Sequence, residues 1–413
     1  MSSTETVKMK RLVDRGARYF TPTVWILFIF AFIGLVIAFG RFFFGLESVT
    51  NFDDDYPWGI WKGFNIASLI AIGGCGFTMA FLTHIYGRHK YSPLIRQAII
   101  FAMLCYTFAP LSLIVDLGRY WAVWHPIFPR WWQGNSVLFE VAMCVILYVT
   151  VLYIEMMPFA VEQYLGKPKF IPIFRIFDKL WDWILLIVNK TLLRILPLFV
   201  ILGVVLSCLH QSSLGTLMVI AGAKIHPLWQ TPLLPLLFLI SAIAVGFPIV
   251  ALLSLGISHS FKKDFEIDLL QYLLRYTPWF LGLYLVLRFV DIFARGAGVY
   301  IFQADPRSYA FLIESVLLIA GFIMFCQKKY RETPTLLFIA SLSTVSGIIL
   351  TRLNAWNVAY RPPLTDHIYM PSLLEVLFTI GLYSGLILFY RFIIIYFPIV
   401  SMRIDAVENR SGK

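Results

Sequence analysis

Ionisable and polar side chains recur inside the apolar segments of this sequence, near one face of the bilayer that those segments would cross. A charged group in hydrocarbon costs about 3 kcal/mol or more unless it is paired or faces water. Such a set predicts either an internal network of ion pairs or a polar site near one membrane face. Its members are Asp116, Arg119, Glu140, His210, Arg288, Asp291, Glu314, Arg352 and Glu375.

These residue types suit the chemistry of a quinone. The ring carbonyls of a quinone need hydrogen-bond donors, and its reduction needs protons close at hand. A histidine beside carboxylates in apolar surroundings supplies both. We therefore expect a quinone site lined by His210, Asp116, Arg119, Glu140, Asn135 and Ser213.

A second set of charged residues could carry protons across the membrane. Its members are Asp291, Glu314 and Arg288 near the outer face, and Glu155, Arg194 and Arg391 in the inner half. Glu155 lies about 22 Å along its helix from Glu140, a gap too long for direct proton transfer. Waters, or the outer groups of the seventh and eighth spans, must therefore bridge it.

The alternative is that these charged groups are neutralised pairs that hold the helices together. Residues three or four apart share one helix face, which makes Arg288 and Asp291 a natural pair. The other pairs expected under this interpretation are Arg119 with Asp116, Arg352 with a nearby glutamate, and Glu155 with Arg194.

The composition is that of an integral membrane protein. Of the 413 residues, 59% are hydrophobic and 14% are charged, which lies outside the range of soluble globular domains. Apolar runs of about 20 residues, the length of a membrane-spanning helix, recur along the chain. We expect an all-α protein with ten spans, at 22–45, 58–86, 93–116, 134–163, 187–211, 232–258, 268–294, 308–327, 333–352 and 371–398.

Lys and Arg are unevenly shared between the loops on the two sides. One side carries nineteen of them and the other five, namely Arg130, Lys224, Arg295, Arg307 and Arg361. Cytoplasmic loops hold the excess of basic residues. This bias predicts a multi-pass protein with both termini in the cytoplasm and an even number of spans. The net charge of +11 then reflects topology and attraction to anionic membrane lipids, and indicates no nucleic-acid partner.

The histidines and cysteines bear on bound cofactors. Haem b usually takes two histidines from facing spans at similar depth. Only His84 and His210 approach the membrane interior, and they lie near opposite faces. The five cysteines sit singly in different spans, without a CxxC pair. We therefore expect menaquinone or ubiquinone as a substrate, and neither haem nor an iron–sulfur cluster within this chain.

Two connecting segments are unusual. The outer loop at 121–132, WAVWHPIFPRWW, holds more aromatic residues than membrane anchoring needs, which favours a docking surface. The inner stretch at 164–186 mixes basic and aromatic residues, which predicts an amphipathic helix at the membrane surface. An irregular loop leading into the fifth span is the alternative for that stretch.

Several short motifs follow one another along nearly the whole chain. They are YPWGIWKGFN (56–65), SPLIRQA (92–98), LSLIVDLGRYW (111–121), NSVLFE (135–140), HQSSLGTLM (210–218), HPLWQ (226–230), VLRFVDI (286–292) and RLN (352–354). Together they resemble the motifs of the NrfD/PsrC superfamily of polysulfide reductase membrane subunits. Within this superfamily, the sequence is most similar to the HybB-like subunits of hydrogenase-2 type [NiFe] hydrogenases, and such subunits lie in the inner membrane of bacteria. Lys62 and Asn65 depart from the apolar and acidic residues that are more usual in the first motif.

The resemblance implies two four-helix bundles with flanking first and last helices. The expected divisions are a basic N-terminus (1–21), the first span with its acidic outer loop (22–57), a first bundle with the quinone site (58–213), a second bundle (214–357), and the last span with its tail (358–413).

The resemblance also implies a function and partners. Members of this kind pass electrons between the quinone pool and a ferredoxin-like iron–sulfur subunit on the periplasmic face. Catalytic subunits, here the small and large subunits of a [NiFe] hydrogenase, lie beyond it, and members of this type carry no haem. A sibling complex built on a polysulfide reductase, a molybdoenzyme or a quinone reductase is one alternative. A secondary transporter is another, although its polar site would lie at the midplane on broken helices.

Overall fold

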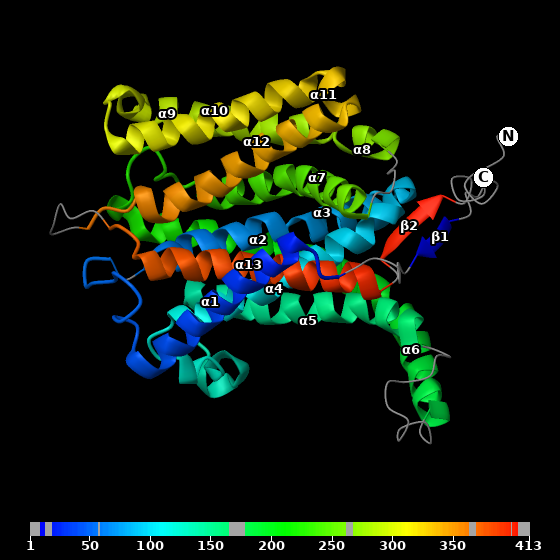
Figure 1. Ribbon diagram of the computed structural model, residues 1–413. Coiled ribbons are helices and arrows are strands. Elements are labelled where there is room, and N and C mark those ends of the chain that lie inside the picture. The colour runs from blue at the N-terminus through cyan, green and yellow to red at the C-terminus, as the bar shows by residue number, and fades with distance from the viewer. Residues whose placement is uncertain are drawn as a thin grey trace.

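The computed structural model describes residues 9–12, 19–56, 58–164, 178–261, 267–362, 369–397 and 399–403. Within these ranges, ten helical stretches are long and apolar enough to cross a membrane. Most of them run lengthwise in Figure 1, so the long axis of the bundle lies along the expected membrane normal. The prediction of an all-α integral membrane protein with ten spans is confirmed.

The first five spans differ in regularity. The second is assembled from four short pieces, whereas the others are mostly single helices. The elements are α1 (Pro22–Phe44), η1 (Trp61–Ile66), α2 (Ala67–Gly73), α3 (Cys75–Ala80), η2 (Phe81–Ile85), η3 (His89–Tyr91), α4 (Ser92–Asp116), η4 (Tyr120–Ala122), η5 (His125–Ile127), η6 (Pro129–Trp131), α5 (Val137–Tyr164) and α6 (Asp178–Ala221).

The last five spans alternate long helices with short connecting turns. The elements are η8 (Gly222–Lys224), α7 (Leu234–Phe261), α8 (Ile267–Leu273), α9 (Thr277–Ala294), η9 (Ala297–Phe302), α10 (Pro306–Cys326), α11 (Lys328–Glu332), α12 (Pro334–Leu353), η10 (Asn354–Val358) and α13 (Leu373–Tyr396). Capping side chains fix where three helices begin, because Thr21, Asp305 and Ser372 each accept a backbone N–H from the following turn.

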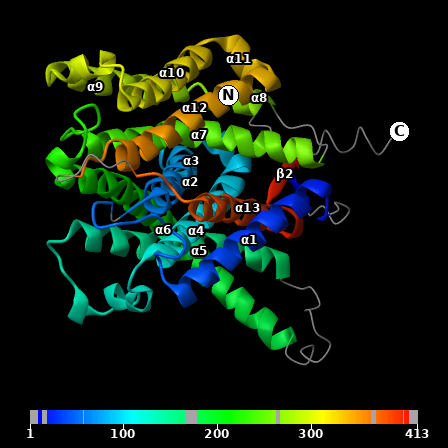
Figure 2. The ribbon, with the colours of Figure 1, turned by 60° about the vertical axis from the view of Figure 1, so that its left-hand side comes forward.

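The spans pack as two groups of four with one flanking pair. In the first group α5 packs along α6, and α4 packs against α2 and α3. In the second, α7, α9, α10 and α12 pack on one another. The flanking pair is α1 with α13, which cross in Figure 2. Their backbones touch because a Cβ at Gly34 would lie 2.9 Å from Gly381 Cα, so both crossing positions require glycine.

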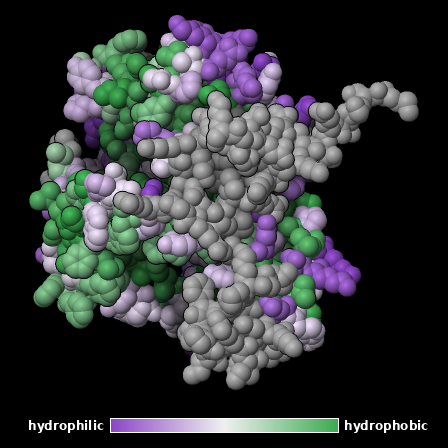
Figure 3. Space-filling model, turned by 45° about the vertical axis from the view of Figure 1, so that its right-hand side comes forward, coloured by the Kyte–Doolittle hydropathy of each residue, from purple (hydrophilic) through white to green (hydrophobic). Residues whose placement is uncertain are grey.

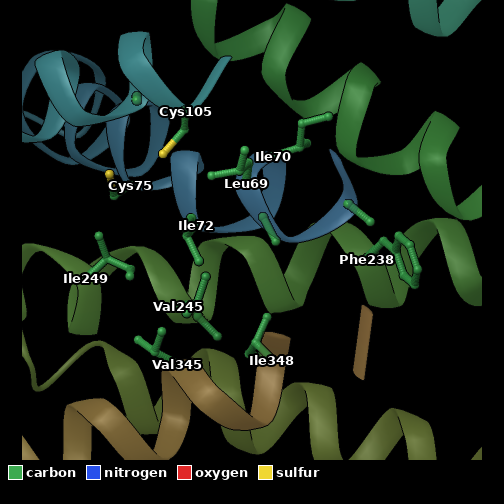
Figure 4. Packing of buried hydrophobic residues seen from close by; sticks show 14 of the residues in the cluster. Leu69, Ile70, Ile72, Cys75, Cys105, Phe238, Val245, Ile249, Val345 and Ile348 are labelled. Carbon is green, nitrogen blue, oxygen red and sulfur yellow. The ribbon is translucent and has the colours of Figure 1, made fainter. Parts of the chain in front are cut away.

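The hydrophobic core lies where the two groups meet, along α2, α7 and α12. Figure 4 shows apolar side chains from these three helices pointing toward one another. Lipid tails are as apolar as these side chains, so burying the side chains away from lipid gives no hydrophobic gain. Close van der Waals packing stabilises the bundle in its place. The labelled residues at this junction include Leu69, Ile70, Ile72, Val245, Ile249, Val345 and Ile348.

The first and last described segments of the chain lie at the same end of the bundle. The short strands β1 (Met9–Leu12) and β2 (Val400–Arg403) pair antiparallel, with Met9 opposite Arg403. This pairing is what an even number of spans requires. Sequence reasoning did not anticipate the strands, because four-residue strands carry too short a pattern to distinguish from loop. That this end faces the cytoplasm stays a prediction.

The fifth span differs from its predicted bounds of 187–211. Helix α6 has 44 residues and continues through the HQSSLG motif to Ala221. The polar run suggested a helix end, but its hydroxyls bond back into the helix: Ser212 donates to the Cys208 carbonyl and Ser213 to the Leu209 carbonyl. Most of the predicted amphipathic stretch, 165–177, lies outside the described residues.

Candidate functional site

An ion pair closes the outer end of the first bundle, the end opposite the chain termini. Lys62 Nζ lies 2.8 Å from Asp116 Oδ2. Lys62 comes from the π-helix η1, and Asp116 is the last residue of α4. The Lys62 side chain is 27% exposed, whereas that of Asp116 is 0% exposed. The pair therefore offers a reachable ammonium donor in front of a buried carboxylate.

Further polar groups surround this pair. Asn65, one turn below Lys62, donates to Ser112 Oγ at 3.2 Å, and its own carbonyl oxygen has no hydrogen-bond partner among the described residues. From α1, the buried Arg41 donates to the Leu117 carbonyl beside Asp116. Arg41 Cζ also lies 4.8 Å from the centre of the Tyr120 ring. The outer end of the first bundle is thus rich in donors.

Glu375, which is expected from the sequence near the same membrane face, has a structural role. It forms a capping box with Ser372 at the start of α13 and accepts the Tyr369 hydroxyl. The backbone carbonyl of Glu375 accepts Trp61 Nε1 at 3.1 Å. These contacts occupy the carboxylate and tie α13 to η1.

His210 lies deeper in the first bundle. Its ring is fully buried against Tyr106, with ring centres 5.5 Å apart, and neither ring nitrogen has a hydrogen-bond partner among the described residues. Gln211 donates to the Ile70 carbonyl at 2.7 Å and to the Tyr106 hydroxyl at 3.4 Å. The Tyr106 hydroxyl in turn lies 3.4 Å from Ser207 Oγ. These groups form a buried polar cluster inside the bundle.

The structure divides the expected quinone site into two parts. Tyr106 and Asp116 lie on the same helix, ten residues and therefore about 15 Å apart. His210 beside Tyr106 is thus well below the Lys62–Asp116 pair. Ser213 donates to Glu140 Oε1 at 2.6 Å, which joins α6 to the first turn of α5.

The remaining two residues expected in the quinone site are exposed. Arg119 lies in the outer loop, and Asp116 pairs with Lys62 in place of it. Asn135 lies in the loop before α5. The expected Arg119–Asp116 pair is therefore wrong, because α4 ends at Asp116 and the chain turns away before Arg119.

Glu155 is buried in the inner half of the first bundle. It has no ion pair among the described residues, and Arg194 is exposed on α6, so the expected Glu155–Arg194 pair is wrong. A Cβ on Gly203 would lie 3.1 Å from Glu155 Oε1 and 3.6 Å from the Tyr148 ring, so the missing side chain leaves room for both. Arg391 lies elsewhere, with Nε donating to the Tyr19 carbonyl at 3.3 Å.

The second bundle holds its own ionic network near the outer end. Arg288 pairs with Glu314 and donates to the Tyr284 hydroxyl at 2.9 Å. Glu314 also accepts Asn354 Nδ2 at 2.6 Å and Trp229 Nε1 at 3.1 Å. A fully bonded carboxylate of this kind holds three spans and the 226–230 loop together.

Asp291 is paired separately. It accepts hydrogen bonds from Arg295 Nε and Thr231 Oγ1, both at 2.9 Å, and Arg295 Nη2 lies 2.7 Å from Asp291 Oδ2 in the same ion pair. The expected Arg288–Asp291 pair is therefore wrong: Arg288 faces the interior and Asp291 the outer loop. A cavity of ≈ 20 Å³, room for a water molecule or two, lies between them and is lined by residues that include Trp229, Thr231, Tyr284 and Thr351.

Arg352 is a buried cation without a carboxylate partner among the described residues. Its Nη2 donates to the Phe238 carbonyl at 2.7 Å and to Ser241 Oγ at 2.9 Å, and Nη1 has no partner there. Its Cζ lies 3.5 Å from the centre of the Phe238 ring. The expected pairing with a nearby glutamate is wrong, and carbonyl and ring contacts take its place.

His226 opens the HPLWQ loop between α6 and α7. Its backbone N–H donates to the Ala359 carbonyl at 2.7 Å, and Nδ1 accepts the Leu228 N–H at 3.3 Å. Burial, and next the charges of Arg361 and Arg307, lower the pKa of His226 to about 4. His226 is therefore a neutral structural residue at ordinary pH.

Some residues of these clusters were missed from sequence. Arg41, Tyr106 and Tyr148 carried no motif, because a lone polar residue in a span does not reveal its neighbours, whereas Gln211 stands in the HQSSLGTLM motif but was not among the residues expected in a site. Lys62 had a signal, since it stands in the YPWGIWKGFN motif as a charge where an apolar residue is more usual.

The comparisons with known proteins decide the family. The sequence model of the family described as "Polysulphide reductase, NrfD" matches residues 48–356. The chain belongs to the NrfD family. A relative from Escherichia coli (strain K12), the "Probable Ni/Fe-hydrogenase 2 b-type cytochrome subunit", is 31% identical over 390 residues, which cover 93% of this chain and 94% of that protein.

A second relative covers a part of the chain. The "Menaquinone reductase, integral membrane subunit" of Nitratidesulfovibrio vulgaris is 32% identical over 197 residues, which cover 46% of this chain and 42% of that protein. Both names describe subunits of redox enzymes, and the second name describes an integral membrane subunit.

One name corrects an expectation. The E. coli relative is called a b-type cytochrome subunit, and a b-type cytochrome is a haem protein. This contradicts the expectation of a chain without haem, which is withdrawn. The reasoning behind it tested only a pair of histidines, whereas a single histidine is the axial ligand in many haem proteins.

His210 is the natural residue on which to test the fit of a haem. Its unpartnered ring nitrogens are the chemistry that an axial ligand supplies. However, the ring is completely enclosed and packed against Tyr106, and this packing leaves no room for a porphyrin.

Proposed function

We propose that this chain is the quinone-reactive membrane subunit of a multi-subunit oxidoreductase in a bacterial inner membrane. The names of the two relatives support this, since one belongs to a hydrogenase and the other to a menaquinone reductase. Hydrogenase is the favoured complex, because the similarity to that relative extends over nearly the whole of both chains. The sibling quinone reductase complex is the alternative.

The Lys62–Asp116 pair carries the proposal for the site. A quinone headgroup that enters at the outer end of the first bundle meets Lys62 first, because its ammonium is partly exposed and the carboxylate is not. Lys62 would donate a hydrogen bond to one ring carbonyl. Asp116 would hold a proton for the oxygen that becomes a hydroxyl. His210 lies below this position and is the deeper group of the site.

The reaction at this position is the exchange between quinone and quinol. Two electrons from a docked iron–sulfur subunit and two protons convert both ring carbonyls to hydroxyls, and the reverse step returns them. The chain needs only to place the headgroup and deliver or accept the protons. We propose that the partner is ferredoxin-like and docks on the outer, periplasmic face, with the hydrogenase catalytic subunits beyond it.

We also propose a route for protons through the first bundle. The buried Glu155 and Tyr148 flank Gly203, and the Tyr148 and Tyr106 rings meet with centres 4.5 Å apart. Ser207 and Gln211 continue from the Tyr106 hydroxyl toward His210. We favour this bridge over one through the second bundle, because Arg288, Glu314 and Asp291 are occupied there by ion pairs.

The transporter alternative has one observation in its favour. The second span is broken, with α2 ending at Gly73 and α3 beginning at Cys75. Transporter sites use such breaks to present backbone groups to a substrate. Here the neighbours of the break are the Tyr106 ring, Cys105 and the Ala242 backbone, so close packing accounts for the glycines.

Binding of a quinone analogue tests the proposal. A fluorescent hydroxyquinoline N-oxide, whose emission is quenched on binding, is titrated into the purified full-length chain. Lys62→Met removes one charged donor, worth about 1.5–3 kcal/mol, and should weaken binding roughly 10- to 100-fold. Arg130→Gln, on the same face but outside the site, should leave it unchanged. Equal affinity in all three proteins would reject the site.

A further inference from the structure

Four basic residues gather at the end of the bundle where the chain termini lie, opposite the proposed quinone site. We call Arg88, Lys90, Arg275 and Arg331 the basic cluster. They come from three separate places: the turn before α4, the turn between α8 and α9, and helix α11. Only the fold brings them together.

One tyrosine is the centre of the cluster. Lys90 Nζ lies 5.0 Å and Arg275 Cζ 4.6 Å from the centre of the Tyr272 ring, which makes two cations neighbours around one side chain. Tyr272 is 43% exposed. Arg88 also interacts electrostatically with Tyr91, as Arg275 does, and the Lys90 ammonium lies 4.9 Å from that ring.

The cations repel one another. Helix α11 packs against α8 and brings Arg331 near Arg275. Burial, and next the charge of Arg275, lower the pKa of Arg331. Like charges held together in this way are stabilised when an anion arrives between them.

The acids nearby are already engaged. Glu332 pairs with Lys328 at 3.2 Å, and Asp268 accepts Gln271 Nε2 at 2.9 Å. Within the described ranges, no carboxylate forms an ion pair with any member of the basic cluster. The cluster therefore carries an uncompensated positive charge on the part of the surface that the structure describes.

The cluster lies at the depth where the spans end. The second span ends at Ile85 and the eighth at Cys326. Exposed apolar side chains lead away from it along the bundle, among them Trp279, which is 79% exposed. Figure 3 shows a hydrophilic patch at the upper edge, at the height of α11, next to hydrophobic surface. A lipid has this same division between a charged headgroup and apolar chains.

We propose that the basic cluster binds the headgroup of an anionic phospholipid, with the acyl chains along the exposed apolar surface of α9. The phosphate takes hydrogen bonds from the guanidinium groups of Arg275 and Arg331 and from Lys90. The Tyr272 ring holds Lys90 and Arg275 in place. The lipid phosphate supplies the negative charge that no described carboxylate brings to the basic cluster.

Lipid binding to the purified full-length chain tests this. Phosphatidylglycerol and phosphatidylcholine are added separately to delipidated protein, and retained lipid is counted by native mass spectrometry alongside Tm. Phosphatidylglycerol should be retained and raise Tm, and phosphatidylcholine should not. The double variant Lys90→Gln/Arg275→Gln should weaken phosphatidylglycerol binding roughly 10- to 30-fold. The matched control Lys328→Gln should not.

Two further arms keep the test decisive. Inorganic phosphate alone should leave Tm unchanged, and a phosphate effect equal to that of the lipid would overturn the lipid assignment. Should the double variant not fold, Arg275→Lys keeps the charge and should retain phosphatidylglycerol, whereas Arg275→Gln should retain less of it. Equal retention of both lipids by the wild-type chain would overturn the proposal.

Discussion

Gly63 and Asn357 face each other where the π-helices η1 and η10 meet, so a glycine of the first bundle contacts an amide of the second. A Cβ on Gly63 would lie 1.8 Å from Asn357 Oδ1. Trp58 Nε1 donates to the Trp356 carbonyl at 3.1 Å in the same contact. Each π-helix adds a residue to a helical turn, a feature found often at functional sites. Here the widened turn of η1 also carries Lys62.

Gly63→Ala should therefore loosen the junction between the bundles. The added methyl group collides with Asn357 and with Trp356 Cβ, 2.9 Å away, and overpacking of this kind costs about 1–3 kcal/mol. A lower Tm in detergent is expected, partly restored by a second change, Asn357→Ala. Gly256→Ala is the control, because nothing lies within 4 Å of its Cβ position. An unchanged Tm for Gly63→Ala would contradict the close contact.

Asp116→Asn separates binding from proton delivery at the proposed quinone site. The amide still accepts a hydrogen bond from Lys62 but holds no transferable proton. Turnover with a soluble quinone in the intact complex should fall about 100-fold or more, while the affinity for the hydroxyquinoline N-oxide changes little. Full turnover in a folded Asp116→Asn complex would show that the carboxylate is not the proton donor.

The spans could be predicted from sequence because a membrane dictates them. Length and apolarity alone define a helix that crosses a bilayer, and the ten stretches appear where the apolar runs lie. The exception is α6, where polar residues in HQSSLG were interpreted as a helix end. Hydroxyls that bond to their own helix carry no such signal.

The partners of the charged residues could not be predicted in the same way. Depth along a span gives the level of a side chain, but not the direction in which it points. Asp116 and Arg288 were each assigned the nearest opposite charge in sequence, whereas each pairs with a residue on another element, Lys62 and Glu314. Pairing across helices depends on helix rotation, which one sequence does not reveal.

Two substitutions that affect the buried arginines of the second bundle should change the free energy of unfolding by different amounts. Glu314→Gln leaves Arg288 without its counter-ion, a change that costs about 3–5 kcal/mol. Arg352→Met removes a charge that has no carboxylate partner in the described structure, so the loss of two hydrogen bonds is offset by the avoided desolvation. Unfolding free energies in mixed micelles should show the larger loss for Glu314→Gln. The reverse order would mean that Arg352 has an acidic partner.

His226 gives the fold a pH dependence at the outer face. Its pKa of about 4 lies below the ordinary value of 6.5, because burial and two arginines disfavour the charged ring. A base with a lowered pKa contributes stability that is present above pH 6.5 and is lost as the pH falls toward 4. The loss amounts to roughly 3 kcal/mol when complete. His226→Gln should flatten Tm against pH over this range, and His125→Gln, at a half-buried histidine of another outer loop, should not. Parallel curves for wild type and His226→Gln would contradict the assignment.

The proton route through the first bundle is testable at its two central residues. Glu155 and Tyr148 both lie next to Gly203, where the absence of a Cβ leaves room beside their side chains. Glu155→Gln removes the titrating group, and Tyr148→Phe removes the hydroxyl that would pass the proton on, so each should abolish proton uptake into sealed vesicles while quinone turnover continues. Glu162→Gln, on the same helix but paired with Arg96 at the surface, is the control and should leave uptake intact. A pH-sensitive dye and a quinone assay on the same vesicles give both readings.

If uptake persists in both variants, Glu155 is a structural residue and protons take another path. If turnover is lost together with uptake, the two residues belong to quinone chemistry, and the separation between an outer quinone site and an inner proton route is wrong.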